Sequence, residues 1–292
     1  MGRILDFQCT YDHASGFGTW ASETYGIVFP KAYQEREEMM ALAKAVKDHN
    51  GMPFCLLPFC HTLESEALGG QVRLGDGVTG PRAGQPLCET VEAILKLPAL
   101  ETEGDKAVRL KETLEACRML KDAGETVVFQ ISGPLTILNG LVDAEVLFRT
   151  LLRKPEVMAA VFEKIGRDIL TVMKAAEDAG ADILSYADPS GGVNLVGPKV
   201  AGRVAKEFTV GLLKEADRIL KKETVVLLCP KTALALIGTD VAEWRDHMLS
   251  ESMEYMDALL YKKKQIRFAG QACVNQVGNR LEDRKLKELV LR

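Results

Sequence analysis

AVRLKETLEACRMLKDAGETVVFQISG, residues 107–133, runs from a helical pattern through a glycine into an apolar segment. Apolar residues recur at helical spacing over 107–123, and Gly124 is typical of a residue that ends a helix. The next segment, TVVFQISG (126–133), is apolar, which favours a strand buried on both faces. A helix followed by such a strand is the repeating unit of a parallel α/β sheet.

The same unit recurs along the chain. We expect strands at 52–60, 126–133, 181–192, 224–229 and 266–273, and helices at 33–49, 107–123, 155–179, 198–221 and 241–260. No strand is followed by a G-x-G-x-x-G or G-x-x-x-x-G-K-[ST] fingerprint, which disfavours an open doubly wound sheet. The 292 residues and this recurrence predict one α/β domain over 1–292, a (β/α)8 TIM barrel with an irregular N-terminal cap at 11–26. The open sheet stays as the alternative.

Composition and charge narrow the function classes. The chain has 37 Lys and Arg against 41 Asp and Glu, a net charge of −4, so it lacks the surplus cations that bind phosphates, and we expect no nucleic-acid partner. No run approaches the ~20 consecutive apolar residues of a membrane span, so we expect no membrane association. The N-terminus has no apolar secretion signal, and the seven cysteines then predict reduced thiols in a cytoplasmic protein.

Chemistry in a parallel α/β fold lies beyond the carboxyl ends of the strands. Three of the seven cysteines fall at such ends: Cys60, Cys229 and Cys273. A buried cysteine is often only a small apolar residue. Three at one rim could instead hold Zn²⁺, which accepts Cys, His and carboxylate ligands in a tetrahedral array. Further polar residues near these ends are His61, Glu64, Glu66, Ser132 and Asp188.

Four segments, in the same order, resemble the uroporphyrinogen decarboxylase superfamily. PFCHTLESEALGGQVRLGDGVTGPR (58–82) resembles its E-A-L-G segment with a G-P loop, and SGPLTILNGLVD (132–143) resembles its G-P-x-T motif. GADILSYADPSGG (180–192) resembles its G-A-D motif with a D-P or D-S turn, and VVLLCPKT (225–232) resembles its H-x-C-G-N-T segment. The likeness is greatest for the corrinoid-dependent methyltransferase branch.

This resemblance implies a zinc enzyme on a TIM barrel. Such an enzyme moves a methyl group between a corrinoid, either methylcobalamin or a corrinoid protein, and a thiol or similar small acceptor. Cys229 matches the cysteine of H-x-C, and Cys273 matches the late cysteine ligand. The family histidine is Leu227 here, and leucine cannot bind a metal. The third zinc ligand would therefore be Glu251 or Cys60.

The resemblance also implies roles for other residues. Asp188 and Glu66 would be catalytic carboxylates that line the cavity and orient the substrate or a zinc ligand. Gly16 and Phe17 would close around a methyl-corrinoid, which a partner corrinoid protein would present at the mouth of the barrel. The remaining substrate-binding candidates are Cys60, His61, Ser132, Asn139 and Tyr186.

Two other functions remain open on the same fold. One is a decarboxylase or other lyase, but residues 15–26 contain no Arg or Lys to bind the carboxylates of a tetrapyrrole. The other is a non-catalytic corrinoid-binding homologue, which the loss of the histidine at Leu227 favours.

Overall fold

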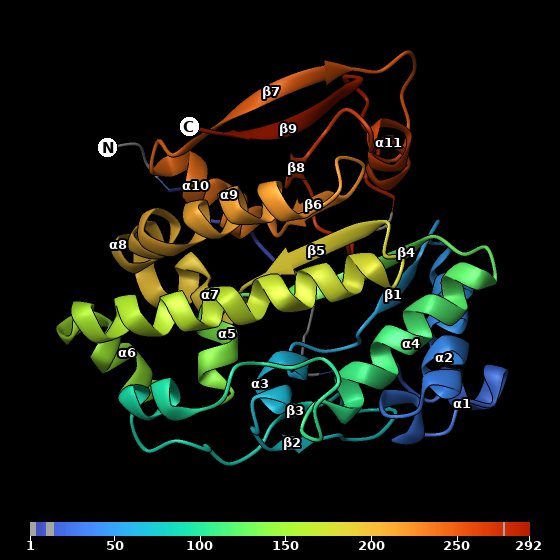
Figure 1. The fold of residues 1–292 in the computed structure, drawn as a ribbon. Coiled ribbons are helices and arrows are strands. Elements are labelled where there is room, and N and C mark those ends of the chain that lie inside the picture. Colours follow the sequence, from blue (N-terminus) through green and yellow to red (C-terminus); the bar gives the residue numbers. More distant parts are fainter. Residues whose placement is uncertain (1–3, 10–14, 277) are drawn as a thin grey trace.

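The computed structural model describes residues 4–9, 15–276 and 278–292 (Figure 1). Its strands are β1 (Cys55–Leu57), β2 (Val72–Arg73), β3 (Arg82–Ala83), β4 (Val127–Ser132), β5 (Ile183–Ala187), β6 (Val225–Leu228), β7 (Ala242–Met248), β8 (Phe268–Ala269) and β9 (Lys285–Leu291). Its α-helices are α1 (Trp20–Tyr25), α2 (Arg36–Asn50), α3 (Leu63–Ala67), α4 (Val108–Asp122), α5 (Pro134–Asn139), α6 (Ala144–Arg153), α7 (Pro155–Asp178), α8 (Val193–Val204), α9 (Val210–Ile219), α10 (Pro230–Gly238) and α11 (Tyr255–Lys262). Short helical segments are η1 (Lys31–Tyr33), η2 (Val91–Lys96), η3 (Pro189–Gly191) and η4 (Ala205–Thr209).

The large sheet has the α/β topology that the sequence predicts. In the described part of the chain its strand order is β1-β4-β5-β6-β8-β9-β7, and a separate small hairpin joins β2 to β3. Neighbouring strands from β1 to β8 in this order are parallel, and helices connect them along the chain. The predicted α/β class is therefore confirmed, because parallel neighbours need crossover connections.

Each parallel strand presents alternate residues to two different apolar cores. In β4, Val127, Phe129 and Ile131 pack in the core shared with α4 and α7, whereas Val128 faces a second core. Leu227 of β6 also belongs to this second core, which lies on the inner face of the curved sheet. A strand buried on both faces reads as a continuous apolar run, as the sequence of β4 does.

The segment 241–260, predicted as one helix, is instead strand β7 followed by helix α11, so that prediction was wrong. β7 pairs antiparallel with β9, from Ala242 opposite Leu291 to Met248 opposite Lys285. Both strands run along one side of the molecule (Figure 1). Pairing with a segment far along the chain outweighs the local helical spacing of β7.

The pairing of β7 with β9 also modifies the predicted eightfold repeat. Strand β9 lies between β8 and β7 and is antiparallel to both. Over the described residues the hydrogen-bonded sheet has β1 and β7 at its two edges. No helix among these residues is long and apolar enough to cross a membrane.

Two parallel strands are shorter than the sequence suggests, and both end close to the site. Pro53 and Pro58 flank β1, and proline lacks the N–H that a strand ladder requires. Strand β8 ends before Gly270, where an added Cβ would lie 2.7 Å from the Cβ of Ala233. Cys273 therefore lies in the loop beyond β8, not in the strand.

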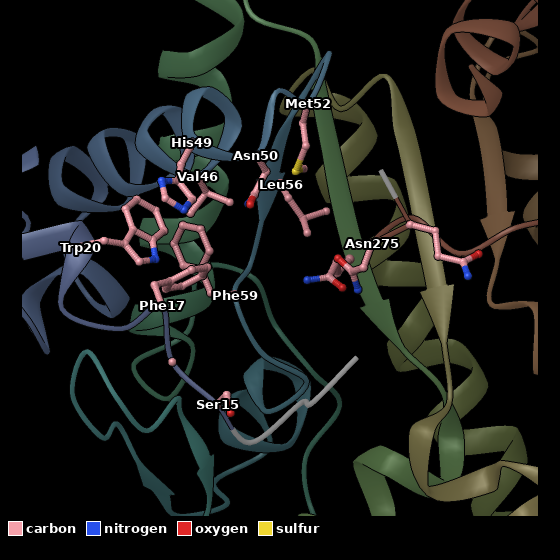
Figure 2. A pocket seen from close by; sticks show the side chains of 13 residues that line it. Ser15, Phe17, Trp20, Val46, His49, Asn50, Met52, Leu56, Phe59 and Asn275 are labelled. Carbon is pink, nitrogen blue, oxygen red and sulfur yellow. The ribbon is translucent and has the colours of Figure 1, made fainter. Parts of the chain in front are cut away.

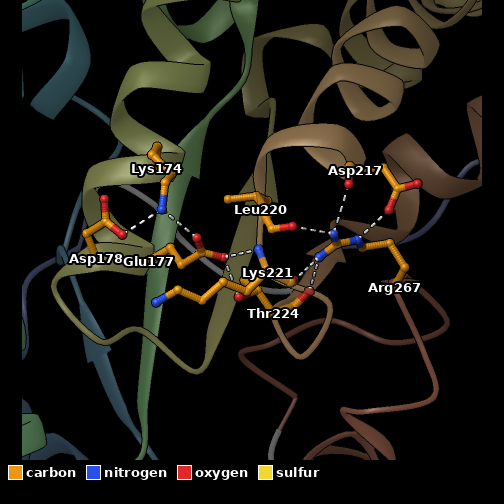
Figure 3. Close-up of polar contacts among 8 residues, drawn as sticks. All are labelled: Lys174, Glu177, Asp178, Asp217, Leu220, Lys221, Thr224 and Arg267. Atoms are coloured by element: carbon orange, nitrogen blue, oxygen red, sulfur yellow. Dashed lines mark hydrogen bonds and ion pairs between the residues drawn. The ribbon is translucent and has the colours of Figure 1, made fainter.

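A polar network holds the amino ends of the strands (Figure 3). The buried Glu177 of α7 accepts hydrogen bonds from the backbone N–H of Lys221 at 2.8 Å and from the hydroxyl of Thr224 at 2.5 Å. Arg267 donates to the carbonyl oxygens of the same two residues at 2.7 and 2.6 Å. Thr224 and Arg267 immediately precede β6 and β8, so this network fixes the ends of the strands opposite the candidate site.

Candidate functional site

A cavity of about 300 Å³ lies at the carboxyl ends of the parallel strands. Its base is a row of inward-facing residues across three neighbouring strands, in which Gln130 is opposite Ser185 and Ser185 is opposite Leu227. Alternate residues of a strand share a face, so Ala187 extends the same lining. The predicted residues His61, Asp188, Cys229 and Cys273 also line this cavity.

Cys229 is brought to the cavity by the end of β6 and the start of α10. It precedes Pro230, the first residue of α10, and its backbone N–H donates to the carbonyl oxygen of Tyr186 at 2.8 Å. Burial raises the pKa of the Cys229 thiol to about 11, and the nearby Cys273 contributes in the same direction. The backbone N–H groups of Lys231 and Thr232 oppose this rise in the pKa.

Cys273 reaches the same cavity from the loop after β8. Burial raises the pKa of its thiol too, while the backbone N–H groups of Asn275 and Gln276 oppose the rise. Because burial raises the pKa of both thiols, a cation between them would favour the thiolate forms. The pair has the softness and the setting that thiophilic metals prefer.

The third zinc ligand named from the sequence is not brought to these two thiols. Glu251 lies on an exposed loop after β7 and does not line the cavity. Cys60 is buried elsewhere and does not line it either. Within residues 4–9, 15–276 and 278–292, no three His, Cys, Asp or Glu side chains are placed to hold one metal ion.

Asp188 faces the cavity, and its carboxylate also holds helix α5. One oxygen accepts from the backbone N–H and the hydroxyl of Thr136 at 2.8 and 2.7 Å, and the other accepts from the N–H of Leu135 at 3.2 Å. Burial raises the pKa of Asp188, and these three donors oppose the rise. A Cβ on Gly133 would lie 2.4 Å from the Asp188 Cβ, so this close approach requires glycine.

His61 belongs to a chain of polar groups that leads away from the cavity. Its Nδ1 lies 3.5 Å from the Oγ of Ser132. The hydroxyl and backbone N–H of Ser132 each donate to the buried Glu64 carboxylate at 2.7 Å. Burial raises the pKa of Glu64, which both bonds from Ser132 oppose. Both the hydroxyl and the N–H of Ser132 therefore bond to Glu64. Of these three residues, His61 is the one that lines the cavity.

Cys60 and Glu66 share the buried Arg109 as their partner. The guanidinium donates to the Glu66 carboxylate at 2.5 Å, to the Cys60 Sγ at 3.2 Å and to the Thr62 hydroxyl at 2.8 Å. Neither Cys60 nor Glu66 lines the thiol cavity. The Arg109–Glu66 ion pair is partly buried and joins α3 to α4, and both Cys60 and Glu66 are bonded to the guanidinium.

A larger cavity of about 680 Å³ adjoins the thiol cavity, since Gln130 and Asn275 line both. Figure 2 shows Phe17, Phe59 and Trp20 grouped on one side of it, with Asn275 across the space. The rings of Phe17 and Phe59 meet edge to face with centroids 5.4 Å apart. Aromatic side chains of this kind offer flat, largely apolar contact area to a ligand.

Gly16, Asn139 and Tyr186 occupy three different settings. The N–H of Gly16 donates to the carbonyl oxygen of Val78 at 2.8 Å beside the larger cavity. Asn139 bonds to Ser190 at 3.5 Å and lines neither cavity, and Tyr186 is buried on the helix-facing side of β5. The predicted cap is described from Ser15 onward, and its residues 11–14 lie outside the described ranges.

Sequence reasoning assigned no site role to several residues around the thiol cavity. Lys231 and Asn194 form a hydrogen bond of 2.5 Å at its rim, and Gln130 donates to the Pro58 carbonyl at 2.6 Å. Cys9 lines the cavity as well, although it is far from every strand end in the sequence. The sequence could have indicated Lys231 as a site residue, because it follows Cys229 in a strand-end segment. Nothing in the sequence indicated Cys9.

Comparison with known families matches residues 19–251 to the family described as uroporphyrinogen decarboxylase (URO-D). This match covers most of the chain, including Cys229 and the residues that surround Asp188.

Two curated relatives carry methyltransferase names. "Methylcobamide:CoM methyltransferase MtaA" of Methanosarcina barkeri is 22% identical over 219 residues, which cover 75% of this chain and 62% of the relative. "Methylcobamide:CoM methyltransferase MtbA" of Methanosarcina acetivorans is 24% identical over 218 residues, which cover 73% of this chain and 62% of the relative. The chain thus spans less than two thirds of the length of each of these relatives.

A solved structure has a similar fold. It is a methyltransferase from Methanosarcina mazei, with a TM-score of 0.62 and 21% sequence identity, covering 77% of this chain and 66% of that chain. At this identity the likeness concerns the fold, and it agrees with the α/β fold class predicted from the sequence.

Proposed function

The chain belongs to the uroporphyrinogen decarboxylase (URO-D) family, and from this premise we propose that it is a corrinoid-dependent methyltransferase. It moves a methyl group between a corrinoid and a thiol or similar small acceptor. The observation that carries the proposal is the pair of thiols, Cys229 and Cys273, which follow two neighbouring strands, β6 and β8, and line one cavity. The methylcobamide:CoM methyltransferase names of the relatives support the same reaction class.

In the transfer toward a thiol, the acceptor thiolate attacks the methyl carbon of a methyl-cob(III)alamin. The Co–C bond breaks as the S–C bond forms, and the bonding pair stays on cobalt to give cob(I)alamin. The acceptor loses its proton before the attack, because the thiolate is the nucleophile. A free thiol with a pKa of ~8.5 is mostly protonated at neutral pH, so the site must favour deprotonation.

Zinc assistance is part of the proposal. The side chains present are of a type that binds zinc, since Cys229 and Cys273 are two soft ligands in one largely enclosed cavity. When bound, zinc would supply the positive charge that keeps an acceptor thiol deprotonated at neutral pH. Glu251 lies outside the cavity lining, so it is not retained as the third ligand in this proposal.

The two adjoining cavities suggest where each substrate lies. The small acceptor fits the thiol cavity of about 300 Å³, with His61 and Asp188 at its wall. A corrinoid is too large to be enclosed there, so a partner corrinoid protein presents it at the larger opening. Phe17 and the rings beside it would then contact the macrocycle (Figure 2).

The lining of the larger cavity argues against the decarboxylase alternative. None of the described side chains that line it is a lysine or arginine. A tetrapyrrole with many carboxylates would need such cations in or near the opening. The same uncharged, partly aromatic lining suits a flat ligand whose charged groups remain with a carrier protein.

An anaerobic assay with methylcobalamin and coenzyme M tests the function. We expect the wild type to consume methylcobalamin, seen as a change in its visible absorption, and to form the methyl thioether. Cys229→Ser and Cys273→Ser should each lower the rate by more than about 100-fold, since both remove a ligand from the reacting centre. Cys88→Ser, a buried cysteine outside the cavity, is the matched control and should retain activity.

Two results would overturn the proposal. One is full activity in both variants of the cavity thiols. The other is corrinoid binding by the wild type with no methyl transfer to coenzyme M or to a panel of other thiols, which would favour the non-catalytic homologue.

A further inference from the structure

The N-terminal segment 4–9 is anchored at its first residue. Ile4 packs against the core that β4 shares with α4 and α7. It also lies against two helices at glycines. A Cβ added to Gly238, the last residue of α10, would come within 2.7 Å of the Ile4 Cα, and one added to Gly202 of α8 would lie 3.2 Å from the Ile4 side chain. Alanine is the better helix former, and glycine at 238 leaves the space that Ile4 occupies.

A second contact fixes the direction of the segment. The Asp6 carboxylate lies 3.4 Å from the Nζ of Lys231, the second residue of α10. The segment therefore runs back along α10, from its last residue toward its first. Lys231 lines the thiol cavity, and among the described residues of that lining it is the only lysine or arginine. Asp6 is thus paired with the cation at the rim of the cavity.

The segment ends at the cavity itself. Cys9 lines it together with Cys229 and Cys273. Cys9 is exposed to solvent, whereas the other two thiols are half-buried. The end of the segment therefore lies on the outer side of the cavity, between its interior and the solvent.

Between these contacts the segment is weakly held. It lies outside every helix and strand, and no backbone hydrogen bond joins residues 4–8 to another described part of the chain. Leu5 is 54% exposed. A segment with few buried apolar contacts and no backbone hydrogen bonds opens at a low free-energy cost, without unfolding the rest of the protein.

We propose that residues 4–9 form a lid over the thiol cavity, held closed by the contact of Asp6 with Lys231 and hinged at its anchor, Ile4. The inference deepens the proposed methyltransferase, because the lid controls the access of the small acceptor to Cys229 and Cys273, and it rests on that function for the identity of the acceptor. Opening also frees the ammonium group of Lys231 at the rim. Lids of this kind admit a substrate and then exclude water from the reaction.

The test measures how accessible the two half-buried thiols are. Metal-free protein is exposed briefly to iodoacetamide, and mass spectrometry of its peptides gives the labelling rates of Cys229 and Cys273. Gly238→Ala places a methyl group where Ile4 lies, and it changes no charge. We expect it to displace the lid and to raise both labelling rates by at least about tenfold, since the closed segment is held by few other contacts.

Asp6→Asn tests the same lid without touching a helix. The substitution keeps the size of the side chain and removes its charge, so it weakens the contact with Lys231 and leaves the anchor at Ile4 in place. Because a partly exposed ion pair is weak, the labelling rates of Cys229 and Cys273 should rise by only about two- to fivefold. This variant tests the inference even if Gly238→Ala does not fold.

Each variant has a matched control. Gly211→Ala adds a methyl group to α9, where no atom lies within 4 Å of the new Cβ, and it should leave both labelling rates unchanged. Asp122→Asn removes the charge of an exposed aspartate at the end of α4 and should also have no effect. The buried Cys88 lies outside the cavity and provides a reference labelling rate in every protein.

The inference falls if folded Gly238→Ala or Asp6→Asn labels Cys229 and Cys273 at the wild-type rates, or if Gly211→Ala speeds their labelling as much as Gly238→Ala does. Labelling does not depend on methyl transfer, so the two proposals can fail separately. Faster labelling in both lid variants, in a protein that transfers no methyl group, would retain the lid and reject the reaction. Methyl transfer with equal labelling rates in all variants would retain the reaction and reject the lid.

Discussion

The Asp188 carboxylate caps helix α5 through Thr136, because one of its oxygens accepts both the backbone N–H of Thr136 at 2.8 Å and its hydroxyl at 2.7 Å. Asp188 directly follows β5, and Thr136 lies in α5, the helix that follows β4. The bonds tie the cavity-lining loop after β5 to helix α5. Asp188 therefore has a positioning role that its place in the sequence does not reveal.

This relationship predicts different outcomes for two substitutions of Asp188. Asp188→Ala removes all three bonds and should lower the free energy of unfolding by about 2 kcal/mol, as the loss of a helix cap does. Asp188→Asn keeps one oxygen acceptor for Thr136 and should cost less than half as much, with methyl transfer retained. Urea unfolding and the coenzyme M assay measure the two effects. A stable but inactive Asp188→Asn would instead make the carboxylate catalytic.

Glu177 makes stability depend on pH. Burial alone would raise its pKa, but bonds from Thr224, Lys174 and Lys221 outweigh it and leave the pKa lowered. A carboxyl whose pKa is lower in the folded state stabilises the protein above its unfolded pKa of ~4.3, and that contribution is lost as the pH falls through the folded value.

Glu177→Gln should therefore lower the free energy of unfolding by about 1–3 kcal/mol at pH 7, since charged hydrogen bonds are lost. The difference from the wild type should shrink below about pH 4. Chemical unfolding across pH 3–8 measures it. Glu163→Gln changes an exposed ion pair on the same helix and should have little effect at any pH. A difference for Glu177 that stays constant over this range would contradict the assignment.

Cys60 should prove structural. Its Sγ accepts from the buried Arg109, so Cys60→Ala leaves part of the guanidinium without a partner and should cost about 1–3 kcal/mol of stability. Zinc content and methyl transfer should be unchanged, because Cys60 lies outside the cavity lining. Loss of zinc in a folded Cys60→Ala protein would restore it as a ligand. Elemental analysis beside thermal unfolding separates the two outcomes.

The local features of the fold could be predicted from sequence, and the non-local ones could not. The run 107–133 encodes its own helix and buried strand, so α4 and β4 were expected within a residue or two. The β7–β9 pair joins segments that lie far apart in the sequence, and neither segment shows a strong alternating pattern by itself. The sequence of the charged C-terminus therefore does not predict that this segment forms a strand of the large sheet.

In the candidate site, too, residues at strand ends could be predicted from the sequence, whereas residues placed by non-local contacts could not. Cys229 and Cys273 were found because strand ends converge at one side of a parallel sheet. Glu251 was proposed from the family resemblance, as a carboxylate from another βα unit, but it lies on an exposed loop after the antiparallel β7. Cys9 lines the cavity from a segment whose Ile4 lies against Gly202 of α8 and Gly238 of α10, and nothing in the local sequence predicts these contacts.

Leu227→His offers the sharpest test of where the metal binds. Leu227 lies at the base of the thiol cavity, two residues before Cys229 and on the same face of β6. An imidazole there would return the donor that the family motif carries. Leu227→His should raise the zinc affinity above that of the wild type, with two sulfur neighbours and one histidine nitrogen seen by X-ray absorption.

Leu227→His should lower the stability of the metal-free protein, and bound zinc should restore that stability. Leu227 is 1% exposed, so an unpaired histidine should lower the stability of the metal-free protein by about 1–3 kcal/mol. Zinc should recover that loss, because binding to the folded state alone stabilises it. Leu56→His, on the inner face of β1 beside the larger cavity, should show the cost without the recovery. A folded Leu227→His protein that gains no zinc affinity would place the metal away from this cavity.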